Sequence, residues 1–218
     1  IVAIIPARGG SKSISKKNLH PFLGKPLIYW TIMQAKESKF INRVIVSTDD
    51  EKIKEVSLKY GAEVPFKRPK KISGDKSTDL EVFRHVTAYL QKNEKISPLL
   101  LVHLRPTGPV RLVSVIDKAI SKMLKNMKYD SLRSVSLASQ TPYKMWSIKN
   151  NAMTPLLKMK NNKESHSTPR QQLPKVYWQN GYVDIVKPST VTKKDSMVGK
   201  KVLSYIINHD VFEIDYYD

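Results

Sequence analysis

Short apolar runs alternate with amphipathic stretches through the first two thirds of the chain. β-Branched residues fill 1–5 and 43–48, and leucine and valine fill 98–104, so each run predicts a buried strand. Apolar residues between and after these runs recur at helical spacing, which predicts helices. They cover residues 28–35, 53–60, 83–90 and 113–124. The alternation predicts an α/β fold with a mainly parallel sheet, right-handed crossovers and flanking helices.

The ends of these helices carry recognisable start and stop signals. Pro26 suits the first helical residue, Asp50 suits the start of the second helix, and Gly61 suits its end. Thr78 is followed three residues later by Glu81, which predicts a capping box at the third helix. We therefore expect Thr78 to act as a helix cap rather than as a substrate contact.

The last third of the chain loses this rhythm. Residues 131–138 alternate apolar and polar side chains, as in a half-solvated strand, and 182–186 and 202–207 also predict strands. Four prolines interrupt the stretch 140–174. This composition favours an irregular excursion inside one domain, 1–218, over a separate second domain.

Charge and cysteine content narrow the chemistry. The net charge of +19 and pI near 9.9 fit either a nucleic-acid binder or an enzyme with a polyanionic substrate. Lysine is dispersed without a long basic block, so nucleic-acid binding is kept only as the alternative class. The absence of cysteine excludes disulfides, thiolate zinc sites and cysteine nucleophiles. No apolar segment approaches the roughly 20 residues that span a bilayer, so we expect a cytoplasmic protein without membrane contact.

A glycine-rich basic loop follows the first apolar run. The adjacent Gly9 and Gly10 let the backbone turn towards an anion, and Arg8, Lys12 and Lys17 supply charge-assisted hydrogen bonds. Open α/β sheets bind ligands where such loops leave the strands. The sequence therefore predicts a phosphate-binding loop rather than an ordinary solvated turn.

The loop matches neither of the two common phosphate motifs. A Walker A loop needs a glycine directly before its lysine, but Ser11 precedes Lys12, and a dinucleotide fingerprint needs three spaced glycines. The loop instead resembles the signature of the CMP-sugar synthetases (acylneuraminate cytidylyltransferases), a strand followed by P-A-R-G-G-S-K-G-I-x-x-K-N. The matching residues are Pro6, Ala7, Arg8, Gly9, Gly10, Ser11, Lys12, Ile14, Lys17 and Asn18, and Ser13 replaces the family's glycine.

The resemblance extends over nearly the whole chain and implies a single Rossmann-like nucleotidyltransferase domain. Its V-V-S-T-D-D and Y-G-A-E-V-P segments fall near 44–50 and 60–65, and its Arg-Pro is Arg68 with Pro69. A looser match places Ser77 and Asp79 near the cytosine. The nucleotide-binding residues that the resemblance implies are Ala7, Arg8, Gly9, Gly10, Ser11, Lys12, Lys17, Asn18, Arg68 and Ser77.

The acceptor side departs from the family pattern. In L-Q-P-T-S-P-L-R the glutamine contacts the sugar, but here Arg105 replaces it and Gly108 replaces the serine. Arginine suits a bidentate grip on a carboxylate or phosphate. The sugar-binding residues implied by the resemblance are Arg105, Thr107, Arg170, Gln171 and Asn180. The family's R-Q-x-L-P-x-x-Y-x-x-N-G motif matches 170–181, which implies that 140–175 is a dimerisation arm and that a homodimer builds the sugar pocket across its interface.

Two acids close to the end of the chain predict a metal site. In an extended segment Glu213 and Asp215 would point the same way, and Mg²⁺ takes one or two carboxylates plus substrate phosphates. The resembled family ends in D-I-D, with both acids serving the metal. The resemblance thus implies Mg²⁺ on Glu213 and Asp215, and catalytic roles for Arg8, Lys17 and Asp215.

The reaction implied by the resemblance joins CTP to an acidic keto sugar. A sialic-acid-like nonulosonic acid would attack the α-phosphorus in line, giving CMP-sugar and pyrophosphate. The alternatives are a CMP-Kdo synthetase or another nucleotide-sugar pyrophosphorylase and, in another class, a basic nucleic-acid-binding domain.

Overall fold

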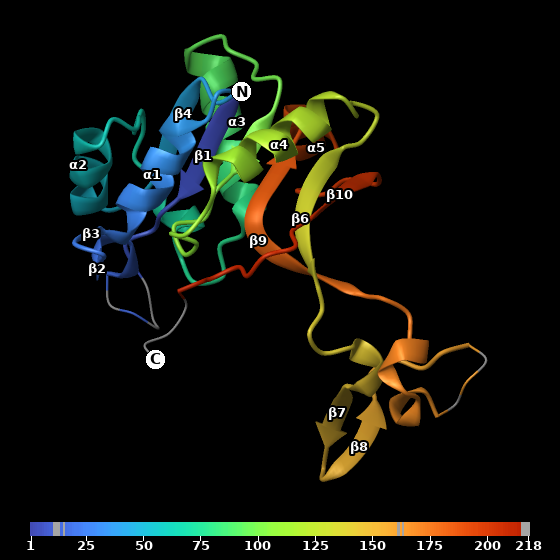
Figure 1. The fold of residues 1–218 in the computed structure, drawn as a ribbon. Helices are drawn as coiled ribbons and strands as arrows, with labels where there is room; N and C mark the ends of the chain where they lie inside the picture. Colours follow the sequence, from blue (N-terminus) through green and yellow to red (C-terminus); the bar gives the residue numbers. More distant parts are fainter. Residues whose placement is uncertain (11–13, 15, 161, 163, 215–218) are drawn as a thin grey trace.

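A six-stranded sheet forms the centre of the computed structural model, which describes residues 1–10, 14, 16–160, 162 and 164–214 (Figure 1). The strand order is β10-β6-β9-β5-β1-β4. The strands are β1 (Val2–Pro6), β4 (Arg43–Ser47), β5 (Leu101–His103), β6 (Ser131–Leu137), β9 (Tyr177–Val186) and β10 (Val202–Ile206). β9 runs antiparallel to β5 and β6, and the other neighbouring pairs are parallel. The prediction of a mainly parallel α/β sheet is confirmed.

Helices cover both faces of this sheet (Figure 1). They are α1 (Leu27–Glu37), α2 (Glu51–Lys59), α3 (Asp79–Asn93), α4 (Val113–Leu124) and α5 (Pro188–Lys193). Alternate residues of β1 explain the layering, since Ala3 and Ile5 pack with α1, α2 and α4 while Val2 and Ile4 pack with α3 and α5. A strand that is buried on both faces has no polar side, as its sequence predicts.

The helix starts follow the sequence signals except at α1. The Asp50 side chain accepts from the backbone N–H of Ile53, and Thr78 with Glu81 forms the complete capping box. Pro26 is the N-cap of α1 rather than its first residue, because Lys25–Pro26 (β3) pairs with Pro21–Phe22 (β2) in a short hairpin. Single-turn 3₁₀ helices lie in the connections at Lys17–Leu19 (η1), Lys70–Ile72 (η2), Pro142–Lys144 (η3), Ser165–Ser167 (η4) and Arg170–Gln172 (η5).

The prediction of a strand at 131–138 is confirmed by β6, but the expectation that its polar side chains face solvent is wrong for its first half. β6 lies between β10 and β9, and its polar residues Ser131, Arg133 and Ser134 are buried. These buried polar side chains are tolerated because each has a hydrogen-bond partner. The Ser134 hydroxyl, for example, accepts from the backbone N–H of Val183. Alternating polarity in this strand therefore marks polar contacts inside the sheet rather than solvent.

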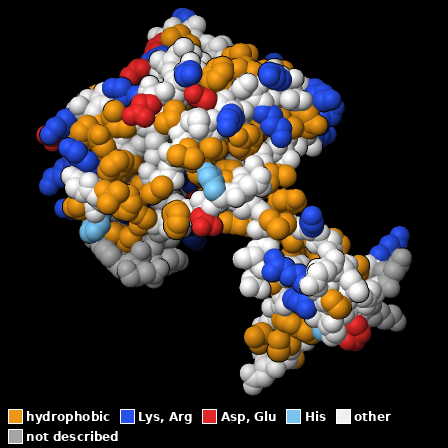
Figure 2. Space-filling view, viewed as in Figure 1, with side chains coloured by type: hydrophobic (Ala, Val, Ile, Leu, Met, Phe, Trp, Pro, Cys, Tyr) orange, Lys and Arg blue, Asp and Glu red, His pale blue; other side chains and the backbone are white. Residues whose placement is uncertain are grey.

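Residues 139–176 leave the body as a protruding arm between β6 and β9 (Figure 1). The arm contains the hairpin β7 (Trp146–Lys149) and β8 (Ala152–Pro155), together with η3, η4 and η5. Its surface keeps apolar side chains exposed (Figure 2), and these are Met145, Trp146, Ile148, Met153, Leu156 and Leu157. The predicted irregular excursion is present at this position.

Basic side chains are scattered over the visible face of the body and arm, with acidic and apolar groups between them (Figure 2). This distribution matches the dispersal of lysine along the sequence. None of the described helices is long and apolar enough to cross a membrane.

Asp130 directly precedes β6 and lies at the end of the sheet opposite the carboxyl ends of the parallel strands. It anchors the chain segment that leads into β10. Its carboxylate accepts from Lys194 Nζ at 2.6 Å and from the backbone N–H groups of Lys200 and Lys201 at 2.8 and 3.1 Å. The Lys194 ammonium and these two N–H groups hold the pKa of Asp130 well below its usual range. This stabilisation is complete above the unfolded pKa of about 3.9 and is lost as the pH falls towards the lower folded value.

We therefore expect Asp130→Asn to lower the melting temperature at pH 7, with a smaller deficit at about pH 2.5, below the unfolded pKa. Thermal melts of the wild type and the variant at both pH values measure this. Equal deficits at the two pH values would contradict the assigned role, and turnover should be unchanged because Asp130 lies away from the cleft described next.

Candidate active site

A cleft of about 580 Å³ opens where β1 and β5 end. The chain passes from β1 outwards to β4 and then returns to β5 on the other side of β1, so this is the point where the strand order reverses. Open α/β sheets bind ligands at such points. The residues that line the cleft are Pro6, Arg8, Gly10, Lys17, Asn18, Arg68, Ser77, Thr78, Asp79, Val82, His103, Arg105, Pro106 and Thr107.

The glycine-rich loop forms one wall of the cleft. Arg8 pairs with Asp75 at 2.5 Å, and the Asn18 amide donates to the Arg8 carbonyl at 3.0 Å, which ties the two ends of the loop together. Gly9 donates its N–H to Asp49 at 3.0 Å, so this N–H is directed away from the cleft. Ala7 is buried, and its N–H donates to Ser47. Ser11 and Lys12, both predicted to bind nucleotide, lie outside the described residues.

Lys17 joins this loop to the C-terminal segment. Its ammonium donates to the carbonyl of Ile214 at 3.0 Å, and the N–H of Ile214 donates to the carbonyl of Thr107 at 2.8 Å. Ile214, the last described residue, therefore lies against two cleft residues. The described part of this segment, 211–214, belongs to no strand, and the expectation that Glu213 and Asp215 share one face stays a prediction.

Glu213 is brought beside the cleft by the same contacts. Its carboxylate lies against Gly181, where a Cβ atom would come within 2.5 Å of Glu213 Oε1, and Gly181 also has a positive φ of 62°. The exposed carboxylate is a hard oxygen ligand of the kind that Mg²⁺ prefers, so the residue fits a metal ion. Within residues 1–214, as far as they are described, no three His, Asp or Glu side chains cluster to hold a metal. Asp215 lies outside the described residues.

Arg68 is a buried cation at the edge of the cleft. Its guanidinium donates to the hydroxyl of Ser47 at 3.0 Å and to the carbonyl of the same residue. Burial lowers the pKa of Arg68 to about 10, which still leaves it protonated at neutral pH. It forms no ion pair with a carboxylate of the described chain. A buried charge whose hydrogen bonds all go to neutral oxygens is well placed to receive an anion.

Arg105 lies on the opposite wall in a network of charged side chains. It contacts Asp184 at 3.0 Å and Asp79 at 3.3 Å, and Asp184 also pairs with Arg133 at 2.8 Å. Burial alone would lower the pKa of Arg105, but Asp184 and Asp79 outweigh it and raise the pKa. The arginine that replaces the family's glutamine is thus permanently charged and held from two sides.

The predicted sugar-binding residues fall in three places. Arg105 and Thr107 line the cleft. Arg170 and Gln171 are on the arm, where they line a separate hollow of about 240 Å³. Asn180 is buried, and its amide bonds to the Ser136 hydroxyl and the Tyr182 N–H, which fixes the β9 backbone around Gly181. A single copy of the chain therefore does not bring Arg170 and Gln171 to the cleft.

Sequence reasoning did not single out His103 or Arg111. His103 is the last residue of β5 and lies in the floor of the cleft, and its only sequence signal is a histidine inside an apolar strand. Arg111 is buried and donates to the carbonyls of Arg105 and Gly108, which shapes the loop after β5. Its position as the last residue of the proline-containing motif could have indicated this role.

Comparison with known proteins agrees with this geometry. Residues 2–197 match the family Cytidylyltransferase. The chain is 30% identical over 217 residues to post-translational flagellin modification protein B of Campylobacter coli, covering 99% of this chain and 89% of that protein. It is 31% identical over 216 residues to the CMP-N,N'-diacetyllegionaminic acid synthase of Campylobacter jejuni, with the same coverage.

The fold is also similar to a solved structure. CMP:2-keto-3-deoxy-manno-octonic acid synthetase complexed with CTP aligns with a TM-score of 0.72 at 14% identity, covering 99% of this chain and 92% of that one. At this identity the likeness concerns the fold alone. With the match over residues 2–197, it follows that the chain belongs to the cytidylyltransferase family.

Proposed function

We propose that this protein transfers the cytidylyl group of CTP to the anomeric hydroxyl of a nonulosonic acid. The hydroxyl oxygen bonds to the α-phosphorus, the bond from that phosphorus to the bridging oxygen breaks, and pyrophosphate leaves. The observation that carries this proposal is the convergence of Arg8, Lys17, Arg68 and Arg105 on one cleft. Charge neutralisation and alignment are what such a transfer demands of a protein.

The two walls of the cleft would bind different substrates. Arg8 and Lys17 would hold the triphosphate, and Arg68 with Asn18 and Ser77 would hold the nucleoside. Arg105 and Thr107 face them and would hold the acidic acceptor, with Asp79 and Asp184 fixing the direction of the guanidinium. In this arrangement the attacking hydroxyl would lie between the acceptor wall and the phosphate loop.

A nonulosonic acceptor is favoured over an eight-carbon one by the sequence relatives. The relative that covers 99% of this chain at 31% identity is named for N,N'-diacetyllegionaminic acid, whereas the likeness to the eight-carbon enzyme is one of fold. Arg105 supplies the permanent cation that an acidic sugar requires.

A pyrophosphate-release assay tests the proposed reaction. CTP, UTP and ATP are each combined with eight- and nine-carbon keto acid sugars, and mixtures without a sugar serve as controls. We expect release only with CTP and a nine-carbon acid. Preference for an eight-carbon acid would favour the CMP-Kdo synthetase reading, and no release with any pair, together with salt-sensitive duplex binding, would favour the nucleic-acid alternative.

Mg²⁺ is the metal that this site would hold, on Glu213 and Asp215 together with substrate phosphates. When bound, the ion would neutralise phosphate charge during transfer. Glu213, the residue of this pair that the structure describes, supports the proposal. The backbone of the next residue, Ile214, is hydrogen-bonded to Thr107 and Lys17, which holds Glu213 beside the cleft. Asn180 would act indirectly, by fixing the β9 backbone at Gly181, against which Glu213 lies.

A homodimer would complete the acceptor site. The arm carries Arg170 and Gln171 away from the cleft of its own chain, and its hairpin exposes apolar side chains that a second copy would cover. Ile148 and Met153 are directly paired across β7 and β8, so they share one face, and they are 71% and 57% exposed. This face is the proposed centre of the contact.

The double variant Ile148→Glu/Met153→Glu should therefore be monomeric, with a weakened apparent affinity for the acceptor. Light scattering gives the mass, and acceptor titration at saturating CTP gives the affinity. Lys149→Glu, an exposed substitution on the same strand, is the matched control and should stay dimeric. An active wild type that is monomeric throughout would refute the shared site.

A further inference from the structure

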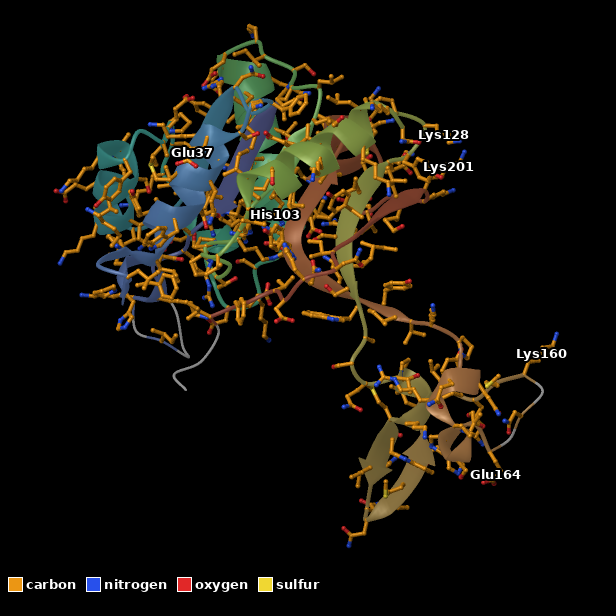
Figure 3. The ribbon with its side chains drawn as sticks, viewed as in Figure 1. Glu37, His103, Lys128, Lys160, Glu164 and Lys201 are labelled. Atoms are coloured by element: carbon orange, nitrogen blue, oxygen red, sulfur yellow. The ribbon has the colours of Figure 1, made fainter. Side chains whose placement is uncertain are left out.

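His103 is a buried histidine in the floor of the cleft that the proposed chemistry has not used. It is 1% exposed and ends β5, and its ring meets the edge of Phe83 at a centroid distance of 5.0 Å. Figure 3 shows it inside the body, whereas Lys160 and Glu164 lie on the arm. It lies two residues before Arg105, and both side chains line the same cleft.

Neither ring nitrogen of His103 has a hydrogen-bond partner within the described chain. The nearest carboxylate oxygen, Asp79 Oδ1, is 3.8 Å from Nε2, which is beyond hydrogen-bond distance. A buried polar group without a partner costs folding free energy, and such groups in native proteins usually have an explanation. A group that enters the cleft would remove this cost.

The imidazole is uncharged at neutral pH. Burial, followed by the positive charges of Arg105, Arg133 and Arg111, lowers the pKa of His103 well below its usual value. The acidic groups that face it, Asp79 on α3 and Asp184 on β9, are themselves engaged by arginines. A neutral imidazole offers one N–H donor and one acceptor nitrogen, which matches a hydroxyl or an amide better than an anion.

We propose that His103 is a specificity residue that hydrogen-bonds to an uncharged hydroxyl or amide group of a substrate in the cleft. This inference rests on the proposed function, and it adds a neutral contact to the cationic ones already assigned. The Asp79 carboxylate, 3.8 Å from Nε2 and 43% exposed, marks the side of the imidazole that borders the cleft, and its pairing with Arg105 is kept when a substrate binds. A site built to bond such a group rejects analogues that lack it, since the imidazole would then stay unpaired.

Two substitutions at His103 and one elsewhere test this role. His103→Leu removes both nitrogens, and we expect about a tenfold rise in KM or Kd for the substrate that carries the group. The melting temperature should not fall, since an unpaired buried polar group is lost. His103→Asn keeps a donor and an acceptor and should recover part of the affinity. His85→Leu is the matched control, because His85 also has an unpartnered ring nitrogen but does not line the cleft.

Two measurements decide which substrate carries the hydroxyl or amide. Calorimetric titration with CTP and dCTP shows whether His103→Leu removes a preference for the ribose hydroxyl. The acceptor KM, measured with sugars that differ in one hydroxyl or acylamino group, shows whether the variant loses discrimination between them. A change in either measurement supports the proposal and identifies the substrate that His103 contacts.

Unchanged affinity for both substrates in His103→Leu would overturn the proposal, as would an equal change in His85→Leu. Failure of the proposed function looks different, because the wild type would then release no pyrophosphate with any acceptor. In that case the CTP titration alone decides the role of His103, and equal binding by the wild type and His103→Leu refutes it.

Discussion

Replacing Arg8 or Lys17 with alanine should reduce turnover by at least about 10² to 10³, the usual cost of one lost transition-state donor. Both side chains line the cleft from the loop that follows β1. The charge of each would be needed most when negative charge moves onto the leaving pyrophosphate, so kcat should fall more than KM rises.

Neither substitution should unfold the protein. Arg8 and its partner Asp75 are 33% and 41% exposed, and an ion pair of this exposure contributes only about 0–1 kcal/mol. Lys17→Ala loses one hydrogen bond to Ile214, worth about 0.5–1.5 kcal/mol. Thermal melts should therefore stay close to the wild-type value while pyrophosphate release is lost.

Lys16→Asn provides the matched control for both variants. Lys16 precedes Lys17 but does not line the cleft, and asparagine tolerates its positive φ of 51°. This variant should keep wild-type rates. Wild-type activity in both Arg8→Ala and Lys17→Ala would exclude the phosphate-loop assignment.

Asp215→Asn should raise the magnesium concentration needed for half-maximal rate by about tenfold or more, because an amide replaces a charged ligand at constant volume. Folding stability should hardly change. Magnesium titrations of the initial rate at saturating CTP measure the effect. Glu213→Asp should be milder, since it keeps the charge and restores the acid of the resembled family, with a water able to bridge the shorter side chain.

Asp210→Asn separates loss of a ligand from general loss of negative charge on the C-terminal segment. Asp210 is an exposed acid on that segment, and the variant should follow the wild-type magnesium curve. If Asp215→Asn also followed that curve, the metal, where one is used, would be held by other residues.

The layers of the fold and one wall of the cleft could be predicted from local sequence because their determinants are local. β1 is apolar at every position and is buried on both faces, and Thr78 and Glu81 cap α3 through bonds spanning three residues. The glycine-rich loop follows β1 directly. Its position at the carboxyl end of that strand could therefore be predicted without knowing any distant contact.

The opposite wall depends on residues that are far apart in the sequence. Arg105 is held by Asp79 from α3 and Asp184 from β9, and Asp184 in turn pairs with Arg133 of β6. These pairings exist only once the strand order places β9 between β5 and β6. For the same reason the polar residues of β6 gave the impression of a solvated strand, and His103 could not be recognised as a cleft residue from its apolar surroundings.

Transfer of an ¹⁸O label from the acceptor tests the central claim most directly. The protein is incubated with CTP, Mg²⁺ and the nine-carbon keto acid sugar that supports pyrophosphate release, labelled at the anomeric hydroxyl, and the products are analysed by mass spectrometry. Attack of that hydroxyl on the α-phosphorus predicts that the label appears in the CMP-sugar and that the pyrophosphate is unlabelled. An unlabelled CMP-sugar with the label released into water, or the absence of any CMP-sugar while CTP is bound, would contradict the account.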